Sequence, residues 1–98
     1  MKALFYHSPF NGNKKPRVTV CGLVQENVGR DDVSVSIGLS RCSEKDPFNK
    51  KKGRIIAVGR AMKNPTSHFV VSKGTELKRF YNVAESLADE IIHHPEYV

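Results

Sequence analysis

The chain has 98 residues and a formal net charge of +6. At this length we expect a single domain, residues 1–98, whose core is near the lower size limit for a chain without disulfides or metals. No apolar run is long enough to cross a bilayer, and the first residues lack the apolar core of a signal peptide. The composition therefore predicts a cytoplasmic protein with no membrane partner. Cys21 and Cys42 lie far apart in strand-like segments, so we interpret them as small core thiols.

The first part of the chain has the alternating pattern of antiparallel strands. Residues Lys2–Tyr6 are short, apolar and aromatic, which is typical of a first strand. The segments Arg17–Val24 and Val33–Leu39 have apolar residues at alternate positions, mostly with serine or threonine between them. Residues 25–32 form a loop of hairpin length rich in Asn, Gly and Asp. These segments predict an antiparallel hairpin whose sheet has one packed face and one wetter face.

The positive charge is concentrated in one segment, Ser40–Pro65. Residues 41–63 contain eight of the sixteen Lys and Arg residues and only two acids, Glu44 and Asp46, so this segment alone accounts for the net charge of +6. A localised cationic segment indicates a specific anionic partner, most often one that contains phosphate. We therefore expect the anion-binding residues to lie in this segment.

The same segment predicts an amphipathic helix of about four turns. Asp46-Pro47 is typical of an N-cap followed by a first helical residue, and Asn64-Pro65 ends the run. Gly53 and Gly59 lower helix propensity and so indicate the close approach of another backbone or of a ligand; tight packing on a sheet is the alternative, and it suits Gly59 better than Gly53. The predicted apolar stripe consists of Phe48, Lys52, Ile55, Gly59 and Met62, flanked by Ile56 and Val58.

The last third of the chain predicts a strand and a second helix. Thr66–Ser72 is a strand expected to pair with the hairpin, and a helix runs from Glu76 to a point before Pro95. Residues 75–82 remain open, because 78–81 also fit a strand followed by a helix with a capping box. The order β-β-β-α-β-α predicts an α+β fold in which two amphipathic helices cover one face of a mainly antiparallel sheet. The second helix has its apolar residues at Leu77, Phe80, Tyr81, Ala84, Leu87, Ala88 and Ile91.

Several kinds of chemistry have no motif in this sequence. Neither a phosphate-binding G-x-x-x-x-G-K-[ST] loop nor G-x-G-x-x-G is present, so the familiar nucleotide-binding folds have no support. The four histidines lack the spacing of a zinc site, and we expect no metal and no cofactor. Because no catalytic motif is found either, we expect that the protein is not an enzyme.

The basic segment does contain the residue types that bind phosphate. A helix N-terminus offers unpaired N–H groups and the positive end of a dipole. Lysines add mobile point charges, and arginines bind phosphate oxygens with two parallel hydrogen bonds. Aromatic residues are candidates for stacking on a base, although core packing explains most of them equally well. The predicted ligand-binding residues are Lys45, Asp46, Lys50, Lys51, Arg54 and Arg60.

The segment Cys42–Ala61, CSEKDPFNKKKGRIIAVGRA, resembles one family. Its Cys-Ser, Lys-Asp turn, aromatic residue, basic run and Gly-Arg-x-Ile-Ala-x-Gly-Arg are similar to the phage-encoded anti-Thoeris sponge proteins of the first Tad type. These are small oligomers that sequester cyclic nucleotide signals of bacterial immunity. The resemblance covers about a fifth of the chain. It implies that Lys45, Arg54 and Arg60 contact ligand phosphates, and that the protein acts in the cytoplasm of the infected host.

Three functions remain open on these grounds. The first is a non-enzymatic phage or bacterial protein, a homo-oligomer, that sequesters a phosphate-containing (cyclic) signalling nucleotide to evade an anti-phage defence. The second is a small basic nucleic-acid-binding protein. The third is an inhibitor of a host defence protein. The first two use the same residues and differ in ligand size and in assembly state.

Overall fold

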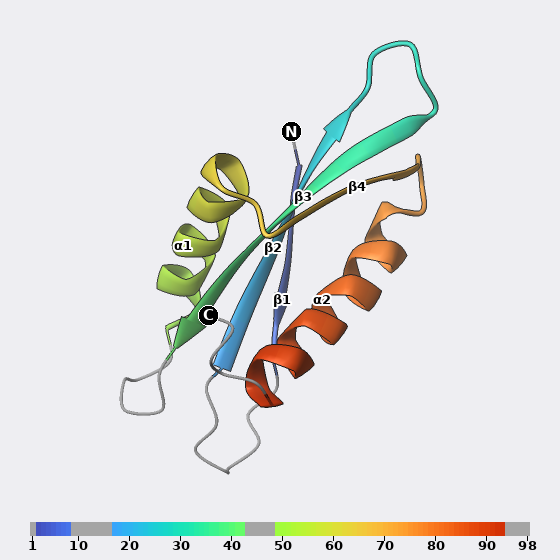
Figure 1. Ribbon diagram of the computed structural model, residues 1–98. Helices are drawn as coiled ribbons and strands as arrows, with labels where there is room; N and C mark the ends of the chain where they lie inside the picture. The colour runs from blue at the N-terminus through green and yellow to red at the C-terminus, as the bar shows by residue number, and fades with distance from the viewer. Residues whose placement is uncertain (1, 9–16, 43–48, 94–98) are drawn as a thin grey trace.

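The computed structural model describes residues 2–8, 17–42 and 49–93, excluding the side chains of residues 42, 92 and 93 (Figure 1). Its sheet is antiparallel throughout, with the strand order β1-β2-β3-β4. This arrangement confirms the α+β class, the hairpin and the pairing of the fourth strand with that hairpin. In chain order the elements are β1 (Lys2–His7), β2 (Arg17–Glu26), β3 (Asp32–Cys42), α1 (Lys50–Lys63), β4 (Ser67–Ser72) and α2 (Glu76–His93).

The two helices lie on opposite faces of the sheet, as Figure 1 shows. Side chains of a strand alternate between its faces. In β2, Val18, Val20 and Val24 belong to the core cluster that includes α2. Cys21 and Leu23, at the intervening positions, pack with α1. The expectation that both helices share one face is therefore wrong, because β2 is buried on both sides.

Helix α2 forms the larger core. Phe80 and Ala84 have no solvent exposure, and Ala88 is 2% exposed. A Cβ at Gly22 of β2 would lie 2.5 Å from the Phe80 ring, so this glycine makes room for the aromatic side chain. The helix is continuous from Glu76 to His93, so the alternative strand at 78–81 does not form. Its predicted apolar face is confirmed at the buried positions, whereas Leu77 and Tyr81 are exposed.

Helix α1 begins at Lys50, three residues after Pro47, which was the expected first helical residue. Its N-cap is Asn49, whose side chain accepts a hydrogen bond from the Lys52 N–H at 3.1 Å. The prediction that Asp46 caps this helix is therefore wrong, and Asp46 itself lies outside the described residues. Asparagine is as good a cap as aspartate. Asn49 was not identified as a cap from the sequence.

Helix α1 packs on the sheet through its smallest residues. Ala57 and Ala61 are buried, whereas Ile55 and Met62 of the predicted stripe are 64% and 65% exposed. A Cβ at Gly38 of β3 would collide with the Ala57 carbonyl oxygen and the Ala61 backbone. The helix backbone therefore lies directly against β3, and bulky residues are excluded from this contact.

The two helical glycines have the reverse of their predicted roles. A Cβ at Gly53 would lie 2.7 Å from Thr19 Oγ1, so Gly53 permits the close contact between α1 and the sheet. A Cβ at Gly59 would meet nothing within 4 Å. The apolar stripe was thus assigned to the wrong side of α1. Of the described helices, neither is long and apolar enough to cross a membrane.

Candidate anion-binding site

The structure separates the predicted ligand-binding residues. Lys50 and Arg54 lie one turn apart at the start of α1, and Arg54 reaches β1. Lys51 is exposed in the first turn of α1. Arg60 leaves α1 toward β3 instead. Lys45, like Asp46, lies outside the part of the chain that the structure describes.

Arg54 contacts two side chains of β1. Its Nε–H donates to His7 Nε2 at 3.3 Å, across 47 positions of sequence. Its guanidinium carbon lies 5.3 Å from the centre of the Phe5 ring, within the range of a cation–π interaction. Phe5 and His7 are two positions apart on a strand, so they point to the same face of the sheet. The bond to His7 uses only one of several guanidinium donors.

A second arginine lies at the start of β2, beside the same histidine. Arg17 donates to the Ser8 carbonyl oxygen from Nη2 at 3.0 Å and from Nε at 3.3 Å. Ser8 is 1% exposed, and its hydroxyl accepts from the Val18 N–H at 2.8 Å. The end of the β1–β2 pair is therefore firmly hydrogen-bonded, and it positions Arg17 next to His7.

The charges around His7 are reflected in its pKa. Partial burial lowers the pKa of His7 below its usual value, and the positive charges of Arg54, Lys50 and Arg17 lower it further. These four side chains come from three elements: His7 from β1, Arg17 from β2, and Lys50 and Arg54 from α1. We refer to His7, Arg17, Lys50 and Arg54 as the basic cluster. A negative group placed there is attracted by the three cationic members, Arg17, Lys50 and Arg54.

Two buried hydroxyl groups lie between the sheet and α1 beside the basic cluster, and one of them bonds α1 directly. Thr19 is fully buried, and its Oγ1 lies 2.9 Å from His7 Nδ1. Ser40, 5% exposed, donates to the Gly53 carbonyl oxygen at 2.9 Å. Serine and threonine on this face were interpreted as a wetter surface. Thr19 and Ser40 are buried under α1 instead, and each hydroxyl has a hydrogen-bond partner there, whereas the other serines of β3 on this face are half-buried.

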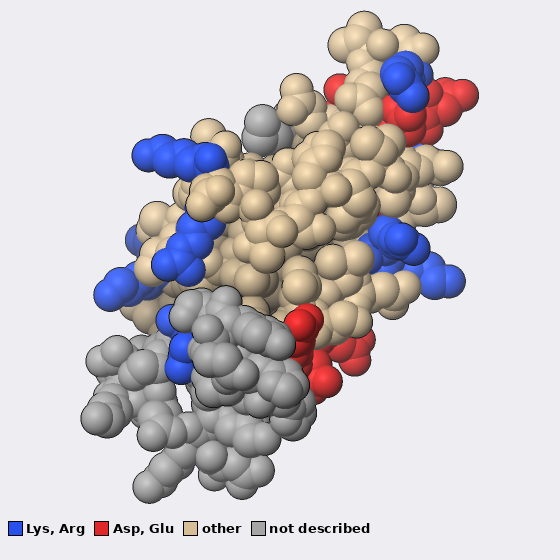
Figure 2. All heavy atoms as spheres, in the orientation of Figure 1, with Lys and Arg blue, Asp and Glu red and all other residues tan. Residues whose placement is uncertain are grey.

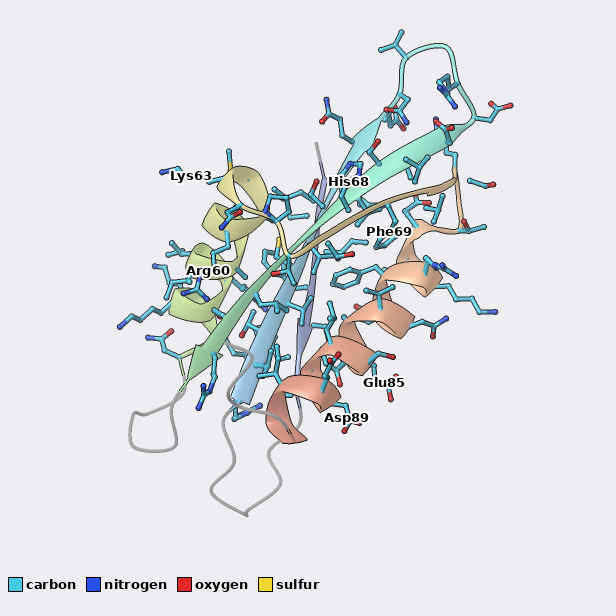
Figure 3. All side chains as sticks on the ribbon, in the orientation of Figure 1. Arg60, Lys63, His68, Phe69, Glu85 and Asp89 are labelled. Atoms are coloured by element: carbon cyan, nitrogen blue, oxygen red, sulfur yellow. The ribbon has the colours of Figure 1, made fainter. Side chains whose placement is uncertain are left out.

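Arg60 lines a separate cavity of about 370 Å³. Its Nη1 donates to the Leu39 carbonyl oxygen at 2.8 Å. The cavity lies between the C-terminal halves of the two helices, and Glu90 of α2 also lines it. Figure 3 labels Arg60 on α1. Arg54 and Arg60 therefore serve different surfaces, and a small ligand at one is not bound by the other.

The two sides of the sheet differ in charge. Figure 2 shows Lys and Arg side chains along the α1 side, whereas the α2 side carries both Lys or Arg side chains and, lower down, acidic ones. Glu85 and Asp89, labelled on α2 in Figure 3, raise the pKa of Tyr6, an effect second to burial of that tyrosine. Tyr6 also packs on Tyr81 with ring centroids 6.4 Å apart. These tyrosines belong to the α2 side, so Phe5 is the described aromatic residue next to the basic cluster.

Cys21 is a buried thiol among the described residues. The Cys21 thiol is fully buried, and burial raises its pKa to about 11, so it is protonated at neutral pH. This burial confirms the interpretation of Cys21 as a core thiol, whereas the side chain of Cys42 lies outside the described part of the structure. Within the described ranges, no group of three His, Cys, Asp or Glu side chains is placed to bind a metal ion.

His7 and Arg17 are cluster residues that we did not identify from the sequence. No neighbouring residue in the sequence indicates a contact between His7 and Arg54. The predicted first strand ended at Tyr6, whereas β1 continues to His7 and so places His7 and Phe5 on one face. Pairing between β1 and β2, which sets His7 opposite Thr19, brings it under α1.

We compared the chain with models of protein families, with characterised proteins and with solved structures, and found no match.

Proposed function

We propose that this protein is a non-enzymatic binding protein that sequesters a phosphate-containing nucleotide at the basic cluster. The observation on which the proposal rests is the convergence of four basic side chains from β1, β2 and α1 on one location. Side chains on rigid elements are positioned before the ligand arrives, which lowers the entropy cost of binding. Phe5, beside Arg54, adds an aromatic surface for the base or ribose of the same ligand.

The resemblance of Cys42–Ala61 to anti-Thoeris sponges narrows the choice among phosphate-containing ligands. It makes a cyclic signalling nucleotide of bacterial immunity the specific proposal, with evasion of an anti-phage defence as the biological role. Lys45 and Asp46 are proposed to contribute from the segment before α1. Assembly into a homo-oligomer stays a prediction, and the exposed Ile55 and Met62 are apolar surface that a second copy would bury.

Equilibrium binding tests this proposal. We expect at least one of cyclic AMP, cyclic di-AMP and ADP-ribose to bind by isothermal titration calorimetry, and more tightly than inorganic phosphate, which lacks the base. Mass spectrometry of the recovered nucleotide should show it unchanged. Hydrolysis of the nucleotide would contradict a sponge, and absence of binding to the entire set would remove the nucleotide proposal.

Binding to nucleic acid is the second candidate, favoured by the exposed Lys50, Lys51, Lys52 and Lys63 along α1. The dependence of affinity on salt concentration distinguishes nucleic-acid binding from nucleotide binding. Affinity for duplex DNA falls with a log–log slope of about −0.9 for each phosphate contact. We expect a short DNA duplex to bind weakly and to be released by moderate salt, while the bound nucleotide depends less on salt. The opposite order would favour the nucleic-acid function.

A further inference from the structure

The tautomer of His7 follows from its contacts with Arg54 and Thr19. Arg54 Nε always has its hydrogen and acts only as a donor, so His7 Nε2 must accept with a lone pair. The proton of the neutral imidazole is then on Nδ1, which donates to Thr19 Oγ1 at 2.9 Å. His7 is therefore neutral in the unliganded protein, and its neutral form is required for the bond to Arg54.

Protonation of His7 has a clear structural consequence. A proton on Nε2 would face the Arg54 Nε–H, so that two donors would meet and the bond would be lost. The imidazolium would also be repelled by Lys50 and Arg54 on α1 and by Arg17 on β2, which are charged groups of the described residues that act on His7. In the absence of an anion, the structure thus opposes a charge on His7.

A bound phosphate reverses this balance. A phosphate oxygen beside Arg54 and His7 accepts from both Nε–H groups, so the two donors no longer oppose each other. Its negative charge also offsets the repulsion among the cationic groups. We propose that His7 is a proton-linked member of the anion site, which takes up one proton when a phosphate-containing ligand binds. This inference rests on the proposed function and adds its dependence on pH.

The sign of the pH dependence follows by linkage. The pKa of His7 is below its usual value in the free protein and is raised in the complex, so the complex binds more protons. Affinity therefore increases as the pH falls through the pKa of the complex, and levels off below the pKa of the free protein. One linked proton changes the dissociation constant by at most about tenfold per pH unit.

The test compares binding at pH 5.5 and pH 7.5 by calorimetry, with cyclic AMP and cyclic di-AMP as probes. Phosphodiesters keep the same charge between these values, so a change in affinity reports on the protein. We expect at least roughly fivefold tighter binding at pH 5.5. Proton uptake should also appear as a dependence of the binding enthalpy on the ionisation enthalpy of the buffer.

His7→Gln is the matched variant, since its amide can accept from Arg54 and donate to Thr19 but does not titrate. The ratio of affinities at the two pH values should fall to near one. A second readout is the His7 ring signal in NMR spectra, whose titration midpoint should rise when probe is added, with exposed His68 as internal reference. Equal wild-type affinity at both pH values, or a pH dependence that persists in His7→Gln, would overturn this inference and leave the proposed function intact. No binding of either probe at either pH would overturn this inference, and if ADP-ribose also failed to bind, the proposed function would fall with it.

Discussion

Gly38→Ala is expected to destabilise the protein strongly. Its added methyl group collides with the Ala57 carbonyl oxygen and the Ala61 backbone, and backbone atoms cannot rotate away as a flexible side chain can. Overpacking of this kind costs about 1–3 kcal/mol and occasionally more. We expect the midpoint of thermal unfolding to fall by about 4–8 °C for each kcal/mol. Urea denaturation followed by circular dichroism measures the loss directly.

Gly59→Ala is the matched control, since it adds the same methyl group where nothing lies within 4 Å. Alanine is the better helix former by roughly 0.5–1 kcal/mol, so this variant should be more stable than the wild type. If both variants had the same stability, α1 would not pack on β3 through its small face. The placement of Lys50 and Arg54 beside β1 would then lose its structural basis.

Arg54→Ala is expected to reduce nucleotide affinity more than any other single change in α1. A hydrogen bond to a charged group contributes about 1.5–3 kcal/mol, which corresponds to roughly a tenfold to hundredfold weaker complex. The fold should be nearly unaffected, because Arg54 is exposed and its cation–π contact with Phe5 contributes only about 0.5–1 kcal/mol at such a site. Calorimetry with cyclic di-AMP, alongside circular dichroism, separates binding from folding.

Two further variants make the Arg54 test specific. Lys63→Ala removes the same charge from the opposite end of α1 and should change affinity by less than about threefold, as expected for an exposed, screened charge. Arg54→Lys keeps the charge but not the forked donor, and should lie between the wild type and Arg54→Ala. An equal loss in Lys63→Ala would mean that the overall charge of α1 binds the ligand, without a defined site.

The strands were predictable because their alternating pattern is local. Every predicted strand was confirmed, with ends that differ by a few residues. The burial of α1 was not predictable by the same method, because the periodicity analysis favoured Ile55 and Met62 over the small residues. Helix α1 contacts β3 at Gly38, which lies in the preceding element of the chain. Because this contact is close, the residues of α1 that face the sheet are the small ones, Gly53, Ala57 and Ala61.

The candidate site was predictable only in the part that belongs to α1. Lys50 and Arg54 were identified from the concentration of charge, and both are in the basic cluster. Arg60 was grouped with Arg54 because both are arginines of the basic segment, yet the six-residue step of helix between them turns Arg60 toward β3. His7 was missed because its contact with Arg54 arises from sheet pairing and helix packing together.

The location of the ligand is the central claim, and NMR mapping of a nucleotide titration tests it most directly. Cyclic di-AMP would be added to ¹⁵N-labelled protein while backbone amides, arginine Nε–H groups and histidine rings are observed. The account predicts that the largest changes occur at His7, Arg17, Lys50 and Arg54, with little change at Arg60. Changes concentrated at Arg60 and the cavity beside it, or spread evenly along the exposed lysines of α1, would contradict it.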